Sequence, residues 1–281
     1  MSHFCVLVIG DNVEEQLAPY QENNMGDCPE EFLRWRDSHG EWHETKEEAQ
    51  QASDKDKQDD IYQENPNAKW DWYVIGGRWS GFFPLAKDGV GLLGERGLFD
   101  KGPRPKGKAD QALKSNIDFK KLIDEARERA TNRYLITKKL FGGVIPKIQK
   151  WSEYTEQVGK LYKTYDEART AFHSQLGCKK LEKIRNERAT LNLSKEESEH
   201  LTWLELGDYQ YMFEEYVDRA AKSAASTFAV VKDGQWYQRG EMGWWGTVHD
   251  EKDSAKWNEE YQKLLDSVSD ETLLTVVDCH I

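Results

Sequence analysis

The feature that most constrains this chain is the pair of apolar runs at its two ends. Residues 3–10 (HFCVLVIG) and residues 271–281 (ETLLTVVDCHI) are rich in β-branched and other apolar side chains and end or begin next to polar residues. Continuous runs of this length are typical of strands that are covered on both faces. Both ends of the 281-residue chain are therefore expected to lie in the core of a sheet.

Two further regions predict strands. Residues 70–85 hold two aromatic strand candidates around a Gly-Gly pair, which can form a hairpin turn because glycine accepts positive φ. Residues 227–238 hold two more around an Asp-Gly turn, which is a strong hairpin signal. We expect these two hairpins to share one antiparallel sheet with the terminal strands.

Helical spacing of apolar residues dominates residues 118–224. Shorter helices are expected at residues 29–37 and 254–267, where they would cover one face of the sheet. Thr45 and Glu48 have the spacing of a capping box, so the acidic stretch that follows is an exposed helix or a mobile loop.

Together these elements predict an α+β fold, with an antiparallel sheet of N-terminal, middle and C-terminal strands and a largely helical insertion. Residues 1–86 and 225–281 would form the core domain. Residues 87–117 are rich in glycine, proline and basic residues and are expected to be a flexible loop. Residues 118–224 would be the insertion.

Composition and charge exclude several classes of protein. Aromatic residues make up 12% of the chain, which is unusual for a disordered protein. The formal net charge of -12 disfavours a nucleic-acid coating protein, so no stable direct binding of nucleic acid is expected, although residues 101–150 are basic. No apolar stretch is long enough to span a membrane and no signal peptide is recognisable. We therefore expect a cytoplasmic protein of the host cell with no membrane partner.

Metal-ligating residues lie near both ends of the chain. His3 and Cys5 share one face of the first strand, and Cys279 and His280 lie on the last, so pairing of these strands could gather metal ligands. Buried cysteine is also common in ordinary cores, and core packing is the favoured interpretation. The sequence does not decide between the two, and we predict no metal and no cofactor.

Aromatic residues and arginines cluster in two places. Arg78 and Trp79 follow the aromatic run at residues 70–75, and Arg239 precedes Trp244 and Trp245. Such groups can stack on a nucleobase, but they also form cores and protein interfaces. Core packing, a protein interface and a nucleotide pocket all stay open at this stage.

Three blocks of this sequence resemble a family of proteins encoded by bacteriophages and prophages. They are residues 1–10 (MSHFCVLVIG) with 15–20 (EQLAPY), residues 70–81 (WDWYVIGGRWSG) and the final residues 278–281 (DCHI). The acidic stretch and the helical insertion are unmatched. The resemblance implies a phage accessory protein, a class with many inhibitors of host defence, of which the Gabija anti-defence proteins are the closest functional comparison. No catalytic residues are carried over from this resemblance.

These observations favour a counter-defence protein that binds and inhibits a host anti-phage nuclease or NTPase complex without catalysis. No complete catalytic motif is present, and an acidic surface could compete with DNA for a basic site. A homo-oligomer is also expected. The helical insertion would supply the partner-binding anchors Trp151, Tyr154, Tyr162, Tyr165, Tyr209 and Tyr211.

The alternative is a nucleotide-binding protein, or a sponge that sequesters an immune signalling nucleotide. Its binding residues would be Arg78, Trp79, Arg239, Trp244 and Trp245.

Overall fold

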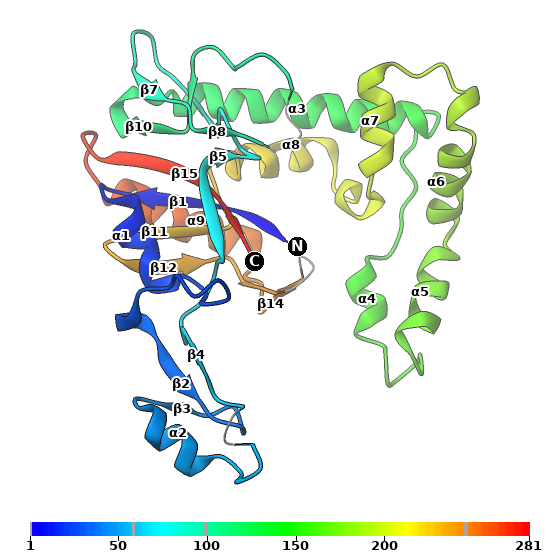
Figure 1. Ribbon diagram of the computed structural model, residues 1–281. Coiled ribbons are helices and arrows are strands. Elements are labelled where there is room, and N and C mark those ends of the chain that lie inside the picture. The colour runs from blue at the N-terminus through cyan, green and yellow to red at the C-terminus, as the bar shows by residue number, and fades with distance from the viewer. Residues whose placement is uncertain (1, 58–59, 98–100, 244–246) are drawn as a thin grey trace. The chain divides into compact units, whose positions relative to one another are not determined.

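The computed structural model describes residues 2–57, 60–97, 101–243 and 247–281. The chain divides into two compact units (Figure 1). Unit 1 comprises residues 1–122 and 225–281, and unit 2 comprises residues 123–224. The insertion predicted from residue 118 thus begins at residue 123, within the long helix α3 (Phe119–Leu140).

Unit 1 is built on a sheet of eight strands among the described residues. The main path runs in the order β12 (Gln235–Gln238), β11 (Ala229–Lys232), β1 (His3–Ile9), β15 (Leu273–His280), β10 (Gln111–Leu113) and β7 (Gly91–Leu92). Off this path, β5 (Trp72–Gly77) pairs with β15 and with β8 (Glu95–Arg96). One edge of β15 pairs with β1, and its other edge is shared by β10 and β5.

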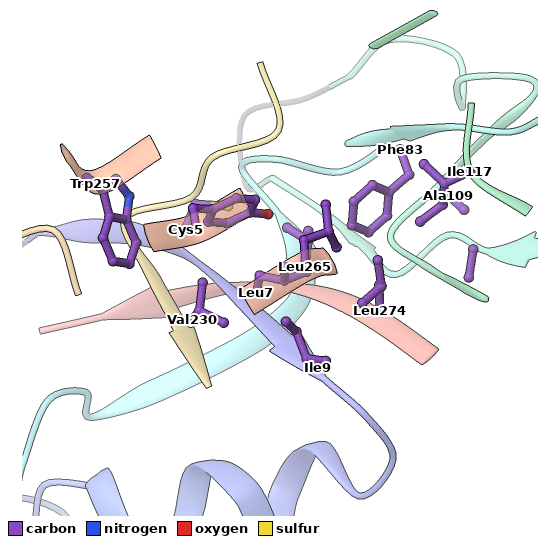
Figure 2. Packing of buried hydrophobic residues seen from close by; sticks show 13 residues of the cluster. Cys5, Leu7, Ile9, Phe83, Ala109, Ile117, Val230, Trp257, Leu265 and Leu274 are labelled. Carbon is purple, nitrogen blue, oxygen red and sulfur yellow. The ribbon is translucent and has the colours of Figure 1, made fainter. Parts of the chain in front are cut away.

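Alternating side chains of β1 enter two different cores. Cys5, Leu7 and Ile9 point toward α9 (Ser254–Asp266), where Trp257 and Leu265 pack in the same cluster (Figure 2). Phe4, Val6 and Val8 pack on the opposite face with Leu17 and Trp70. Both terminal strands are therefore buried on both faces, as their sequences predict.

The predicted α+β class is confirmed, but the sheet is mixed rather than antiparallel. β1 is antiparallel to β15 and parallel to β11, and β5 is parallel to β8. The whole of unit 2 lies between β1 and β11 in the sequence. A connection of that length can return the chain to the starting end of the sheet, which a tight hairpin cannot do.

The two predicted hairpins have different outcomes. The hairpin of β11 and β12 is confirmed, and its turn residues Asp233 and Gly234 have φ values of 53° and 72°. The hairpin at residues 70–85 is wrong, because Gly76 and Gly77 continue β5. The next strand, β6 (Phe83–Pro84), pairs with β9 (Lys108–Ala109) instead.

The helix predicted at residues 29–37 is also wrong. Only the single 3₁₀ turn η2 (Glu30–Phe32) forms, and β2 (Arg34–Arg36) follows it. Cross-strand partners outweigh the local helical pattern: Arg34 Nε lies 2.9 Å from Glu44 Oε1, and Arg36 Nη1 lies 3.0 Å from Glu64 Oε2. β2 pairs with β3 (Trp42–His43) and β4 (Tyr62–Glu64), beside the capped helix α2 (Lys46–Ala52).

Residues 87–117 were expected to be a flexible loop, and the described part of this segment is not one. It contains β7, β8, β9 and β10, which join it to the sheets of unit 1. Its glycines serve close packing: a Cβ on Gly91 would lie 2.6 Å from the Cβ of Ala109. Residues 98–100 lie outside the described part of the chain.

The remaining elements of unit 1 are short. They are α1 (Val13–Leu17), η1 (Ala18–Tyr20), η3 (Lys114–Asn116), β13 (Glu241–Met242) and β14 (Val248–His249).

Unit 2 is helical, as its sequence predicts. After α3 come α4 (Trp151–Thr155), α5 (Tyr165–His173), α6 (Leu176–Asn186), η4 (Arg188–Thr190), α7 (Lys195–Trp203), η5 (Leu206–Tyr209) and α8 (Phe213–Lys222). Their main core contains Phe141, Leu181, Leu201 and Leu204. A second, smaller aromatic group joins α4 to α5, where the ring of Tyr154 contacts the rings of Tyr162 and Phe172.

Candidate functional site

Three neighbouring strands of unit 1 bring two histidines together. In the register of the sheet, His3 of β1 lies opposite His280 of β15, and His280 lies opposite Trp72 of β5. We call His3, His280, Trp72, Asp71 and Asp278 the histidine cluster. The strands that form it carry the three sequence blocks at residues 1–10, 70–81 and 278–281.

Each histidine is held by its own carboxylate. His3 Nδ1 lies 2.8 Å from Asp278 Oδ1, and His280 Nδ1 lies 2.7 Å from Asp71 Oδ1. A carboxylate accepts hydrogen bonds only, so Nδ1 of each ring carries the hydrogen. When a ring is neutral, its Nε2 then has a free lone pair. Both rings are therefore held in the tautomer that suits a base or an acid acting through Nε2.

The rings of the cluster pack against one another. The centroids of His3 and His280 are 4.9 Å apart, and the Trp72 ring stacks on His280 at 4.9 Å and meets His3 edge-on at 5.3 Å. The histidine side chains keep only 12% and 6% of their surface exposed. Trp72 is 42% exposed. The two imidazoles thus lie just below the protein surface, beside an indole that faces solvent.

The glycine pair of β5 lets the main chain wrap around the carboxylate of Asp278. Gly77 has a φ of 55°, and a Cβ at this position would collide with the Asp278 side chain. The next amide, that of Arg78, donates a hydrogen bond of 2.9 Å to Asp278 Oδ2. Asp278 therefore positions both the imidazole of His3 and the main chain of Arg78.

A second buried carboxylate, Asp110, fixes the turn that follows. Its Oδ1 accepts hydrogen bonds from the amides of Gly81 and Phe82, and its Oδ2 accepts them from Gly94 and the Ser80 hydroxyl. Sequence reasoning missed Asp110, because it is 30 residues distant from Ser80 and carries no motif of its own. Its role is to hold the chain after Arg78.

The surroundings of the histidine cluster are acidic and contain no activated thiol. Burial, together with the charges of Asp71 and Glu64, raises the pKa of the Glu22 carboxyl. Burial, and next the charge of Asp278, raises the pKa of Cys5 well above its ordinary value. Cys5 therefore stays protonated and is a core side chain rather than a nucleophile.

The metal-binding interpretation of the chain ends fails on geometry. His3 and Cys5 share the face that carries His280, but Cys279 pairs with Phe4 and packs in the opposite core. Within the described ranges, no group of three or more His, Cys, Asp and Glu side chains could hold a metal ion. The packing explanation therefore accounts for both cysteines.

The residues predicted for nucleotide binding are only partly brought together. Arg78 is exposed, and its amide donates a hydrogen bond to Asp278. Trp79 is partly buried and packs against the core below α9, which leaves it poorly placed to stack on a base. Arg239 forms an ion pair with Glu251. Trp244 and Trp245 lie outside the described residues.

The predicted partner-binding anchors of unit 2 divide into buried and exposed side chains. Tyr154 and Tyr209 are buried, so they pack the insertion's own core and are wrong as anchors. Tyr162 is half-buried in the aromatic group of α4 and α5. The Tyr211 ring is half-buried and contacts Lys150 and Arg219. Tyr165 is 61% exposed and Trp151 is also exposed.

Sequence reasoning missed the most exposed apolar side chains of unit 2. Leu176 is 86% exposed and Trp203 is 84% exposed, at the start of α6 and the end of α7. We define the exposed apolar set of unit 2 by its six most exposed members. These are Val144, Leu161, Tyr165, Leu176, Trp203 and Met212. Trp203 could have been suspected, since it lies at the end of a helix and off its apolar stripe.

No protein-family model, curated protein or solved structure matches this chain. Among the helices of the described residues, none is long and apolar enough to cross a bilayer.

Proposed function

We propose that this protein is a phage-encoded counter-defence protein that binds and inhibits a host anti-phage nuclease or NTPase complex. The resemblance of three sequence blocks to phage and prophage proteins motivates the proposal. The observation that carries it is the exposed apolar set of unit 2. Large apolar side chains at 84% and 86% exposure stabilise no fold, and tryptophan is among the preferred anchors of protein interfaces.

The charge of unit 1 supports the same partner class. Unit 1 contains 34 acidic and 21 basic residues, whereas unit 2 contains 17 and 18. A nuclease has a basic site for DNA, and an acidic protein can approach it quickly and compete with the nucleic acid. In this proposal unit 2 supplies the apolar anchors and unit 1 the electrostatic attraction. Binding of this kind would inhibit the target without any catalytic step.

The test is capture of host proteins by the tagged full-length protein from cells that carry an anti-phage defence system. A double substitution, Leu176→Ser with Trp203→Ser, should reduce capture of the defence complex at least tenfold, because each anchor contributes about 2 kcal/mol. The matched control is Val90→Ser in unit 1. Val90 is likewise an exposed apolar residue, with 72% of its surface open to solvent. This substitution should leave capture unchanged.

The proposal is wrong if the double variant, with an unchanged unfolding temperature, captures as much of the complex as the parent protein. It is also wrong if the parent protein captures no defence component and protects phage from no defence system.

The same side chains would serve self-association, and we propose a homo-oligomer as part of this function. A stable interface buries about 1,600 Å² in total, which requires several such anchors at once. Sedimentation at two protein concentrations should show an oligomer for the parent protein and a monomer for the Leu176→Ser, Trp203→Ser variant. A monomer at both concentrations for the parent protein would contradict this part.

The nucleotide-binding alternative has narrower support. The residue that still supports it is Arg78. Its side chain is exposed, and its main-chain amide donates a hydrogen bond to Asp278. A bound nucleotide would raise the unfolding temperature by mass action, so thermal unfolding with cyclic dinucleotides and NAD-derived signals tests it. No shift at millimolar ligand would remove this alternative.

A further inference from the structure

The histidine cluster is not needed for the binding function proposed above. Two imidazoles on neighbouring strands are each held at Nδ1 by a different carboxylate, and their ring centroids are 4.9 Å apart. The two rings meet edge to face, with an interplanar angle of 77°. One oriented imidazole is common in folded proteins, whereas two that share one target are suited to paired proton transfer.

We propose that His3 and His280 are a general acid–base pair that cleaves the 3′,5′-phosphodiester bond of a short oligoribonucleotide. One imidazole, neutral at Nε2, removes the proton of the ribose 2′-hydroxyl. The 2′-oxygen forms a bond to phosphorus as the bond from phosphorus to the 5′-oxygen breaks. The other imidazole, protonated on both nitrogens, donates its Nε2 proton to that leaving 5′-oxygen. The products are a 2′,3′-cyclic phosphate and a free 5′-hydroxyl, and no oxidant, reductant or added nucleophile is consumed.

The chemistry of the neighbours selects this substrate class. Cys5, the next side chain on the same face, is buried and protonated, so the cluster offers no nucleophile of its own. A substrate that carries its own hydroxyl beside the reacting phosphorus removes this need. The 2′-hydroxyl of a ribonucleotide lies in that place, and it is absent from DNA.

Two exposed groups could hold such a substrate. The Trp72 indole, half of it open to solvent, can stack on a nucleobase. Arg78 carries a guanidinium suited to the phosphate, and its amide shares the Asp278 carboxylate with His3. The acidic excess of unit 1 opposes binding of a long polyanion, so we name short linear or cyclic oligoribonucleotides rather than duplex or polymeric RNA.

Asp71 and Asp278 act as positioning residues for the two imidazoles. The Asp278 carboxylate accepts hydrogen bonds from His3 Nδ1 and from the amide of Arg78. The Asp71 carboxylate accepts them from His280 Nδ1 and from the amide of Trp72. The charged groups near the pair are these two carboxylates and Glu22, whose pKa responds to both Asp71 and His280.

The experiment uses the purified full-length protein in EDTA with three substrates. They are a linear diribonucleotide, a cyclic 3′,5′-diribonucleotide and a deoxyribonucleotide of the same bases, followed by chromatography of the products. We expect cleavage of the linear or the cyclic ribonucleotide to a product with a 2′,3′-cyclic phosphate, and no cleavage of the deoxyribonucleotide. The first two substrates distinguish a linear from a cyclic source of the same bond.

Variants assign the activity to the cluster. His3→Gln and His280→Gln should each lower the turnover rate at least about 100-fold. The matched control is His43→Gln. His43 also pairs with a carboxylate, since its Nε2 lies 2.8 Å from Asp37 Oδ2. Unlike His3 and His280, it has no ring contact with a second imidazole among the described residues. This substitution should leave turnover unchanged. Asp71→Asn should lower turnover and shift the pH profile while the Michaelis constant stays within twofold, an effect that a loss of stability does not produce.

The inference is overturned if neither ribonucleotide is cleaved, if the deoxyribonucleotide is cleaved at the same rate, or if folded His3→Gln and His280→Gln proteins keep full activity. Should the histidine variants lose their cooperative unfolding transition, Arg78→Gln carries the test, since Arg78 is exposed. It should raise the Michaelis constant about tenfold with an unchanged unfolding temperature, and an unchanged constant would overturn the inference. Failure here leaves capture of a host complex through unit 2 unaffected, because that assay uses other residues.

Discussion

Unit 1 and unit 2 differ in where they place their large apolar side chains. Among the described residues, ten of the sixteen exposed large apolar side chains belong to unit 2, although it comprises only residues 123–224. In unit 1, β1 is buried on both faces. Its first residue, His3, forms a hydrogen bond with Asp278 of β15. Unit 1 buries most of its large apolar side chains and gathers polar groups, whereas unit 2 leaves more of them exposed. The function proposed above assigns that exposed apolar surface to contact with another molecule.

The largest expected effect separates two tryptophans of opposite exposure. Trp257 of α9 is 2% exposed and its indole donates a 2.8 Å hydrogen bond to the carbonyl of Thr227. Trp257→Ala should lower the free energy of unfolding by about 3–5 kcal/mol. Trp203→Ala in unit 2 should change it by less than about 0.5 kcal/mol. Urea unfolding of both variants measures the contrast, and an equal loss in both would break the comparison.

A second pair tests the comparison inside unit 2. Tyr154 is buried against Tyr162 and Phe172, whereas Tyr165 at the start of α5 is exposed. We expect Tyr154→Ala to cost about 3 kcal/mol and Tyr165→Ala to cost almost nothing. Hydrogen exchange of the amides in α4 and α5 reports this directly. If Tyr165→Ala exposes those amides as strongly as Tyr154→Ala, then Tyr165 is a core residue and not an anchor.

The third prediction concerns the turn that holds the histidine cluster. Gly77→Ala introduces a Cβ at a φ of 55° and against the Asp278 side chain. The expected loss is about 1–3 kcal/mol, with displacement of the Arg78 amide from Asp278. Gly234→Ala is the control, since Gly234 also has a positive φ of 72° but no atom within 4 Å of an added Cβ. Equal thermal destabilisation in the two variants would show that φ alone, and not the carboxylate, sets the cost.

The smallest effect is a pH dependence confined to the sheet of β2, β3 and β4. Its Asp37 carboxylate accepts hydrogen bonds from His43 and from the amides of Glu41 and His39, which lower its pKa to about 2. The ordinary pKa in an unfolded chain is about 3.9. The stabilisation is therefore complete above about pH 4 and is lost as the pH falls through about 2.

Tryptophan fluorescence between these pH values checks this, because Trp35 and Trp42 lie on the same small sheet. The parent protein should show a local transition in that range. Asp37→Asn, which lacks the titrating group, should show a weaker one. An identical transition in both proteins would place its origin elsewhere.

Much of the fold follows from local patterns in the sequence. The terminal strands, the Asp233-Gly234 hairpin, α9 and the capping box of Thr45 and Glu48 all form where their residues predict. Each depends on residues that are close together along the chain. The path of β5 does not depend on nearby residues alone. A Cβ on Gly76 would collide with the side chain of Asp110, and one on Gly77 with that of Asp278, and both aspartates are distant in sequence.

The candidate site was predicted only in part for the same reason. The pairing of the two ends brings His3 and His280 together, as their positions suggest, but neither carboxylate partner has a local signal. Strand alternation that begins at Trp70 would put Trp70 and Trp72 on the same face. The structure buries Trp70 in the core below α1 and leaves Trp72 exposed, because β5 begins only at Trp72.

The central claim is that the apolar contacts with the protein partner are made by unit 2 and not by unit 1. Hydrogen–deuterium exchange of the full-length protein, alone and with the captured host complex, tests it most directly. The account predicts new protection in the segments around Leu161, Leu176 and Trp203 and unchanged exchange in β1 and β15. Protection confined to unit 1, with no change around those three side chains, would contradict it.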